Sequence, residues 1–269
     1  MKTQLLSEWM KNAYLYLIII VIVAVSVIAA VLNTTGSKSS SSSSIGEKVN
    51  QSDILAMQNI ASNTSLANQI GLGTASGLPT PENGILITEN GLPAVVFVGA
   101  DYCPYCAASR WGLILALMRF GNFTNLRYMQ SNSTDVYPNT PTFTFYESSY
   151  TSNFIAFMPV EIEARNYSPL EVPNNIQNLT YAKYDKGVGI PFVDFGNKSV
   201  QLGSEIDPKM LDGYSWSYII KELSDPSSSF SQAIIGSANV FTAQICRMDN
   251  NTPKSVCDQP YVSRILEFQ

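Results

Sequence analysis

The chain has 269 residues, four cysteines, no histidine and a net charge of −5. The absence of histidine excludes a Ser–His–Asp triad, a histidine general base and any histidine-ligated metal site. The acidic balance gives no basic surface for nucleic acid, so we expect no nucleic-acid partner. Any thiol chemistry must use the four cysteines.

The N-terminal segments indicate a membrane anchor. Residues 1–12 form a short polar head with Lys2 and Lys11, and residues 13–32 are an apolar run without a charge. The run matches the about 20 residues that a helix needs to span a bilayer, and a cleaved signal peptide has a shorter apolar core. We therefore expect a retained single-pass anchor. The two lysines predict a cytoplasmic N-terminus and an extracytoplasmic main domain at the cell membrane.

A tether and a helical lead-in come next. Residues 33–46 are rich in Gly and Ser, which is typical of a flexible linker. Within residues 47–84, an apolar stripe that begins at Ile54 has helical spacing and predicts a helix that packs on the main domain. A short strand is expected at 85–87, followed by a turn at Asn90-Gly91.

The central motif joins a buried strand to a helix that opens at a cysteine pair. Residues 94–99 are a valine-rich apolar run, and the sequence Cys103-Pro-Tyr-Cys106 follows after a short loop. Pro104 suits the first position of a helix, where its missing N–H has no intrahelical partner. The helix is expected to continue through Trp111 and to end at Gly121.

The placement of the pair predicts its chemistry. A cysteine at a helix N-terminus faces unpaired N–H groups, which favour the thiolate and lower the pKa. We expect Cys103 to be an exposed nucleophile and Cys106, one turn further on, to resolve a mixed disulfide. Arg110 adds positive charge on the same helix. Zinc is disfavoured, because its two further ligands are missing. A purely structural Cys103–Cys106 bond stays open.

An aromatic segment follows a predicted strand at 126–130. Residues 142–146 and 154–162 are expected to form a hairpin or an extension beside the cysteine pair. The aromatic side chains suit core packing or, alternatively, an apolar surface for peptide substrates: Phe143, Phe145, Tyr146, Tyr150, Phe154 and Phe157. Glu161 and Glu163 are expected on one side of a strand. A solvent-exposed face of that strand is a better explanation for them than a role as catalytic acid and base.

A second motif lies in the sequence Gly189-Ile-Pro191-Phe-Val-Asp-Phe. A short helix is expected at 173–186, a strand at 192–195 and a returning edge strand at 199–202. Taken alone, Pro191 would be assigned an ordinary trans bond, since cis bonds are a small minority before proline. Helices are expected at 207–223 and from 226 to Cys246.

The last two cysteines bracket a polar loop. We expect Cys246 and Cys257 to form a structural disulfide, which would add about 2–4 kcal/mol of stability around a loop of this size. Such a bond fits an oxidising compartment. A second redox pair that exchanges electrons with Cys103 and Cys106 is the alternative.

The two motifs together carry a family resemblance. The cysteine segment resembles the active site of thioredoxin-fold disulfide oxidoreductases, and the Cys-Pro-Tyr-Cys form occurs in glutaredoxins and some periplasmic disulfide isomerases. The Ile-Pro-Phe segment is similar to the cis-proline loop of that fold, which implies that Pro191 is a cis-proline beside the pair. The whole chain looks like an uncharacterised archaeal family of membrane-anchored thioredoxin-fold proteins. In contrast to thioredoxins proper, the strand 95–98 carries no acid, and Asp101 lies in the loop.

The expected fold class is therefore α/β: a thioredoxin-like fold with an inserted segment, preceded by a single N-terminal transmembrane helix. The thioredoxin-like domain would span residues 85–225 with an insert at about 131–175. Residues 226–269 would form a C-terminal helix and the Cys246–Cys257 loop.

Asn-x-Ser/Thr sequons are frequent outside the predicted anchor, which is typical of a glycosylated surface protein, although an Asn- and Ser-rich composition alone also produces them. The candidate acceptors are Asn63, Asn122, Asn132, Asn166, Asn178 and Asn250. A seventh sequon, at Asn197, lies in a tight turn where access is restricted.

The functional hypothesis is a membrane-anchored, extracytoplasmic thiol–disulfide oxidoreductase. Cys103 would be the nucleophile, Cys106 the resolving cysteine and Pro191 part of the substrate groove. No cofactor is expected. Protein thiols and disulfides would be the substrates, with a redox partner protein and the membrane, through residues 13–32, as further partners. The rival hypothesis is a non-catalytic cell-surface binding or structural protein stapled by two disulfides.

Overall fold

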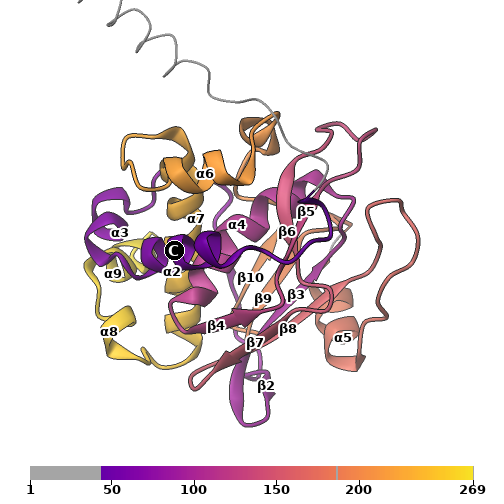
Figure 1. Cartoon of the computed structure of the whole chain (residues 1–269). Helices are drawn as coiled ribbons and strands as arrows, with labels where there is room; N and C mark the ends of the chain where they lie inside the picture. The colour runs from indigo at the N-terminus through magenta and orange to yellow at the C-terminus, as the bar shows by residue number, and fades with distance from the viewer. Residues whose placement is uncertain (1–43, 186, 269) are drawn as a thin grey trace, which may run out of the picture. The chain divides into compact units, whose positions relative to one another are not determined.

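Six strands form the central sheet of the computed structural model, which describes residues 44–185 and 187–268 (Figure 1). Their order is β1-β10-β9-β3-β2, and β8 pairs with β3. The β3–β8 pair is parallel and the other pairs are antiparallel. The strands are β1 (Thr80–Pro81), β2 (Thr88–Glu89), β3 (Leu92–Gly99), β8 (Ala156–Glu161), β9 (Phe192–Phe195) and β10 (Ser199–Leu202).

β3 is buried on both faces, and its alternating side chains enter two separate apolar clusters. Val95 and Phe97 belong to the larger cluster, whereas Val96 and Val98 belong to a smaller one on the opposite face. This explains why the strand is a continuous apolar run rather than an alternation of apolar and polar residues.

Helices cover both faces of the sheet. In Figure 1 the sheet lies between α5 on one side and α4 and α7 on the other. The smaller cluster contains residues of α5, and the larger one is built from α2, α4 and α7. These helices are α2 (Gln51–Ser62), α4 (Pro104–Met118), α5 (Asn175–Tyr184) and α7 (Ser229–Met248). Gly112 allows the close approach of α4 and α7, because a Cβ there would collide with Ser237.

Shorter elements complete the domain. Two small antiparallel sheets pair β4 (Gly121–Thr124) with β7 (Ser149–Ser152), and β5 (Arg127–Gln130) with β6 (Pro141–Thr144). The remaining helices are α3 (Thr64–Ile70), η2 (Pro208–Leu211), α6 (Trp216–Glu222), α8 (Lys254–Cys257) and α9 (Pro260–Leu266).

The aromatic segment packs into the core. Phe143 and Phe145 are buried, and the Phe145 ring lies 5.0 Å from that of Phe97 and 4.9 Å from that of Phe157. The two parts of the segment do not pair with each other. Residues 141–144 pair with β5, and residues 156–161 join the central sheet beside β3. Of the two arrangements expected for this segment, the hairpin is therefore wrong, because residues 156–161 pair with β3 and residues 141–144 pair with β5.

Two other expected elements differ in extent. The strand expected at 85–87 is displaced to β2 at Thr88–Glu89, and Asn90 and Gly91 form the turn into β3 with positive φ values of 52° and 82°. The helix expected at 207–223 is divided into η2 and α6. Gly213 has a φ of 74°, which ends the first segment, and the Ser215 side chain caps the second.

The expected fold class, a thioredoxin-like α/β fold preceded by one transmembrane helix, is corrected to a mixed α/β domain. In the described residues no helix is both long enough and apolar enough to cross a membrane. α7 has 20 residues, but polar side chains such as Asn239 and Gln244 interrupt its apolar sequence. The expected anchor at 13–32 lies outside the described residues, as do the head at 1–12 and the linker up to residue 43.

The disulfide between Cys246 and Cys257 is formed, with a Cα–Cα distance of 5.4 Å. It joins the end of α7 to the end of α8 across 11 residues of sequence. Both cysteines are buried, and the bond fixes the polar loop against the apolar side of α7.

We expect the double substitution Cys246→Ala and Cys257→Ala to lower the free energy of unfolding by about 3 kcal/mol, because the closed loop no longer restricts the unfolded chain. Denaturant unfolding monitored by circular dichroism measures this change. Wild-type protein in excess dithiothreitol should match the double variant in the same reductant. Equal stability of oxidised wild type and variant would contradict the prediction.

Candidate functional site

Cys103 and Cys106 lie at the start of α4, directly after the carboxyl end of β3. Cys103 is the N-cap residue, and its Sγ accepts a hydrogen bond from the Cys106 N–H at 3.3 Å. Both cysteines are free. A sulfur at the N-cap faces the unpaired N–H groups of the first helical turn, which stabilise negative charge there. The expected strand, loop and helix therefore bring the pair to the place where a thiolate is favoured.

The Cys103 side chain is recessed rather than exposed. Only 6% of the residue is accessible, and Cys106 is fully buried. Tyr102, Ile162 and Ile190 pack against the pair. The expectation that Cys103 is exposed is therefore wrong, because the side chains of these neighbours cover the thiol.

The two thiols differ in acidity. Interaction with the Cys106 thiol and with the Cys106 N–H lowers the pKa of Cys103 below its ordinary value of 9.0, against the opposing effect of burial. Burial, and then the neighbouring Cys103, raises the pKa of Cys106 well above that value. Arg110 favours the thiolate at both positions. Cys103 is thus the thiol that ionises first.

The cis-proline loop faces the pair. The Ile190–Pro191 peptide bond is cis, and the Ile190 carbonyl oxygen lies 3.9 Å from Cys103 Sγ, which donates to it. The structure thus brings together the three residues that the sequence predicts for the catalytic site. Residues more than 80 positions apart in sequence meet at this point because β9, which follows Pro191, pairs with β3.

Tyrosines from the first turn of α4 and from three loops lie around the pair. The ring of Tyr102 lies 4.5 Å from that of Tyr167, and the ring of Tyr105 lies 6.0 Å from that of Tyr137. Tyr105 and Tyr167 are 43% and 46% exposed, so an approaching molecule meets aromatic surface before it reaches Cys103.

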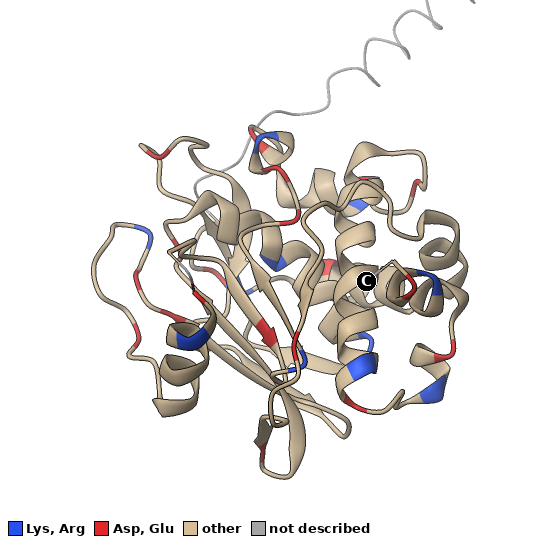
Figure 2. Cartoon of the chain, turned by 180° about the vertical axis from the view of Figure 1, so that it is seen from behind, with Lys and Arg blue, Asp and Glu red and all other residues tan. Residues whose placement is uncertain are grey.

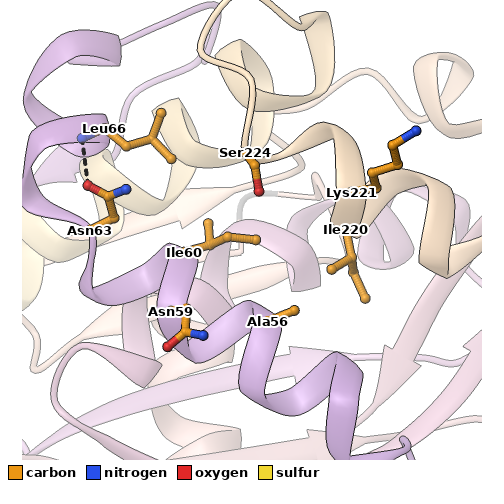
Figure 3. A pocket seen from close by; sticks show the side chains of 8 residues that line it. All are labelled: Ala56, Asn59, Ile60, Asn63, Leu66, Ile220, Lys221 and Ser224. Atoms are coloured by element: carbon orange, nitrogen blue, oxygen red, sulfur yellow. Dashed lines mark hydrogen bonds between the residues drawn. The ribbon is translucent and has the colours of Figure 1, made fainter.

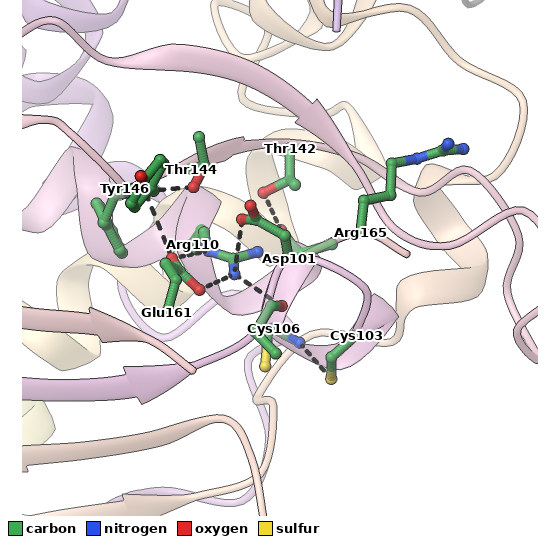
Figure 4. A network of polar contacts seen from close by, with 12 residues as sticks. Asp101, Cys103, Cys106, Arg110, Thr142, Thr144, Tyr146, Glu161 and Arg165 are labelled. Atoms are coloured by element: carbon green, nitrogen blue, oxygen red, sulfur yellow. Dashed lines mark hydrogen bonds and ion pairs between the residues drawn. The ribbon is translucent and has the colours of Figure 1, made fainter. Parts of the chain in front are cut away.

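A buried charge network lies behind the pair (Figure 4). The Arg110 guanidinium donates to Glu161 through Nε at 2.9 Å and through one terminal nitrogen at 2.5 Å. The same terminal nitrogen donates to the Ala100 carbonyl at 2.9 Å and lies 3.7 Å from Asp101. This network, which we call the Arg110 cluster (Asp101, Arg110, Glu161), holds the loop before Cys103 against α4.

The Arg110 cluster places two acids beside one cation. Burial raises the pKa of Glu161 to about 7, although Arg110 opposes the shift. Burial also raises the pKa of Asp101, again against the effect of Arg110. One positive charge can balance one carboxylate, so near neutral pH the cluster favours a proton on one of the two acids.

Sequence reasoning missed this network. It assigned Glu161 to a solvated face, yet Glu161 has no accessible surface. The available signal was its position at the carboxyl end of a strand, since the carboxyl ends of the parallel strands β3 and β8 meet at one edge of the sheet. A second missed acid is Glu205, which is 2% exposed and accepts hydrogen bonds from Ser109 of α4 and Ser237 of α7.

Charged groups outside the Arg110 cluster are dispersed. Figure 2 shows Lys and Arg scattered among Asp and Glu over the described part of the chain. Within that part, no group of three potential ligands could hold a metal ion. A pocket of about 340 Å³ between α2 and α6 contains Lys221 and Asn59 but no thiol or acid (Figure 3). It is separate from the cysteine pair and carries no chemistry of its own.

The predicted glycosylation acceptors differ in access. Asn132 is partly buried, and its side-chain amide donates to the Arg165 carbonyl at 2.7 Å. Asn197 donates to the Ile85 carbonyl at 2.8 Å, in agreement with restricted access. The other candidate acceptors are exposed: Asn63, Asn122, Asn166, Asn178 and Asn250. Geometry thus favours these five as acceptors.

Comparison with known proteins gives one match. A family model described as "Domain of unknown function (DUF929)" matches residues 83–247, which is more than half of the chain. The matched region contains the cysteine pair, Pro191 and the Arg110 cluster. Neither a curated protein nor a solved structure matches the chain.

We expect Arg110→Met to lower the free energy of unfolding by about 3–5 kcal/mol, because a buried carboxylate of the Arg110 cluster loses its counter-charge. Arg127→Met is the matched control. Arg127 pairs with Glu147 at the surface, where such a pair contributes at most about 1 kcal/mol. Denaturant unfolding at pH 7 compares the two variants, and equal losses would contradict a special role for the Arg110 cluster.

We expect the stability difference between wild type and Glu205→Gln to depend on pH. Burial raises the pKa of Glu205 from 4.5 to about 7. The folded state therefore binds this proton more tightly, and the stability it contributes is complete below pH 4.5 and is lost as the pH rises through 7. Relative to the variant, wild type should lose about 3 kcal/mol between pH 4.5 and 8.

The measurement is chemical denaturation of both proteins across this pH range. A difference between wild type and Glu205→Gln that stays constant across this pH range would contradict the prediction.

Proposed function

Since the chain belongs to the family described as a domain of unknown function (DUF929), we propose its function from the site itself: it is a thiol–disulfide oxidoreductase. The observation that carries the proposal is geometric: Cys103 is the N-cap residue of α4, its Sγ accepts from the Cys106 N–H at 3.3 Å, and it lies 3.9 Å from the Ile190 carbonyl beside the cis-proline Pro191. The Cys103 pKa is lowered, which favours the attacking thiolate, and the Cys106 pKa is raised, which keeps the second cysteine as a thiol until a mixed disulfide forms.

In the reductive direction the Cys103 thiolate attacks one sulfur of a substrate disulfide. The substrate S–S bond breaks, a Cys103–substrate disulfide forms, and the other substrate sulfur leaves as a thiolate that takes up a proton. Cys106 then loses its proton and attacks Cys103 Sγ, which releases the second substrate thiol. Two electrons pass to the substrate, and the Cys103–Cys106 disulfide remains.

The surroundings support each step. The N–H groups of the first turn and Arg110 stabilise the thiolate of Cys103, both before the attack and when it is released again. Burial keeps Cys106 protonated, which delays its attack until a mixed disulfide has formed beside it. Pro191 and the Ile190 carbonyl form the wall against which the substrate sulfur would lie.

The reverse direction uses the same geometry. A Cys103–Cys106 disulfide would oxidise a substrate dithiol, and the reduction potential of the pair against its compartment decides between the two directions. The Cys246–Cys257 disulfide supports an oxidising compartment, because such bonds persist there. Polypeptide thiols and disulfides are the proposed substrates, and the tyrosines around the pair support this choice.

A second candidate is a non-catalytic binding protein that uses the same scaffold. The 6% accessibility of Cys103 favours it, because an attacking thiolate must reach its substrate. The two candidates differ in what they predict for substitutions at the pair.

We expect Cys106→Ser to accumulate a mixed disulfide with insulin, because Cys103 still attacks an insulin disulfide, displacing its other sulfur as a thiol, and nothing resolves the product. Cys103→Ser should form no adduct and should lose insulin-reduction activity at least about 1000-fold, since the nucleophile is gone. Non-reducing electrophoresis and a turbidity assay measure the two effects.

Cys246→Ala with Cys257→Ala is the control, because it removes the disulfide that lies away from the start of α4 and should retain activity. If wild type shows no activity in either direction and Cys106→Ser forms no adduct, the pair is structural and the binding protein is the better description.

A further inference from the structure

A pocket on the far side of the domain combines an apolar lining with a single cation. It has a volume of about 280 Å³ and lies among α2, α3, the end of α4, α8 and α9. Arg119, the C-cap residue of α4, lines it, together with hydroxyl groups of Ser62, Thr64 and Tyr261. We call this the Arg119 pocket. Its volume is just below the range of about 300–1,000 Å³ that is typical of small-molecule sites.

Arg119 has no acidic partner in the described part of the chain. Its Nε donates to the Ala61 carbonyl at 3.1 Å, and Nη1 donates to Thr242 at 2.8 Å and to the Tyr261 hydroxyl at 3.1 Å. No described residue accepts a hydrogen bond from Nη2. No acidic side chain lines the pocket. Nη1 also donates to the Ala238 carbonyl at 3.3 Å, and the guanidinium carbon lies 5.2 Å from the centre of the Tyr261 ring. The guanidinium is thus held by neutral acceptors and an aromatic ring, and no described carboxylate balances its charge.

Comparison with Arg110, in the middle of α4, shows that Arg119 lacks a carboxylate partner among the described residues. Arg110 lies beside two carboxyl groups in the Arg110 cluster. Arg119 lies in a site where burial lowers its pKa, which indicates that its charge is costly there. A partly buried cation without a counter-charge is expensive, and an anion in the adjoining pocket would offset that cost.

The lining indicates which anion fits. One guanidinium and no lysine line the pocket, so a single negative charge balances it. Nη2 and the Tyr261 hydroxyl proton are donors without a described acceptor, and a carboxylate has two oxygens to receive them. Ala67, Met118 and Val256 provide apolar surface beside these donors.

We propose that the Arg119 pocket binds a small organic carboxylate, with its carboxylate at the Arg119 guanidinium and a short apolar tail against Ala67, Met118 and Val256. This site is separate from the cysteine pair and does not depend on the proposed redox function. The same helix joins the two places, since α4 begins at Cys103 and ends beside Arg119.

The test is isothermal titration of the full-length chain with butyrate, in Tris buffer and a nonionic detergent. Butyrate should bind at one site per chain. Acetate should bind roughly tenfold more weakly, because its tail is two methylene groups shorter. Inorganic phosphate should bind more weakly than butyrate, since its second charge has no partner.

Two variants locate the site. Arg119→Gln should weaken butyrate binding by about tenfold or more, because a charged hydrogen-bonding partner is lost. Arg127→Gln removes the same charge from an exposed surface pair and should bind as wild type does. Thr64→Phe fills the pocket from an exposed position, leaves the Arg119 partners intact and should abolish binding.

Three results would overturn the proposal. The first is no heat of binding for wild type up to about 10 mM butyrate. The second is unchanged affinity in Thr64→Phe, which decides the matter even if Arg119→Gln fails to fold. The third is tighter binding of phosphate than of butyrate, which would assign the pocket to a different class of anion.

Discussion

The arrangement of the site depends on the buried ion pair between Arg110 and Glu161. Arg110 belongs to α4 and Glu161 is the last residue of β8, so the pair joins the helix that carries the cysteines to the strand beside β3. The third partner of Arg110, the Ala100 carbonyl, belongs to the loop that leads into Cys103. Helix, strand and loop are thus held by one guanidinium, and the position of the thiols follows from it.

The same pair links stability to thiol chemistry. A buried ion pair seldom adds net stability compared with apolar residues, but it strongly disfavours arrangements in which one partner is left alone. Its value here is therefore specificity of position, together with a positive charge that favours the thiolate of Cys103. The pKa values of Cys103 and Cys106 differ for two reasons. Hydrogen bonds from the Cys106 thiol and the Cys106 N–H favour the thiolate of Cys103 at the N-cap, whereas burial disfavours the thiolate of Cys106.

Local sequence signals predicted the parts of this site that are determined locally. The strand at 94–99, the helix start at Pro104 and the strand at 192–195 each follow from an apolar run beside a proline or glycine. Glu161 could not be placed in this way, because its partner Arg110 is 51 residues distant. In addition, the sequence of β8 combines apolar and acidic residues. Without knowledge of its parallel partner β3, such a sequence is interpreted as a strand with one solvent-exposed face. The aromatic residues between them were ambiguous for the same reason, since only the pairings of β6 with β5 and of β8 with β3 showed which of them face the core.

The two arginines of α4 extend this reasoning to the whole helix. Both are held by backbone carbonyls of neighbouring segments, Arg110 by Ala100 and Arg119 by Ala61 and Ala238. They differ in their counter-charge: Arg110 has two acids, whereas Arg119 has none in the described residues. α4 therefore connects two sites through one rigid element: the cysteine pair at its start and the Arg119 pocket at its end. Because α4 packs along α7, which is fixed in turn by the Cys246–Cys257 bond, a ligand at Arg119 would act on the same packed helices that support the cysteine pair.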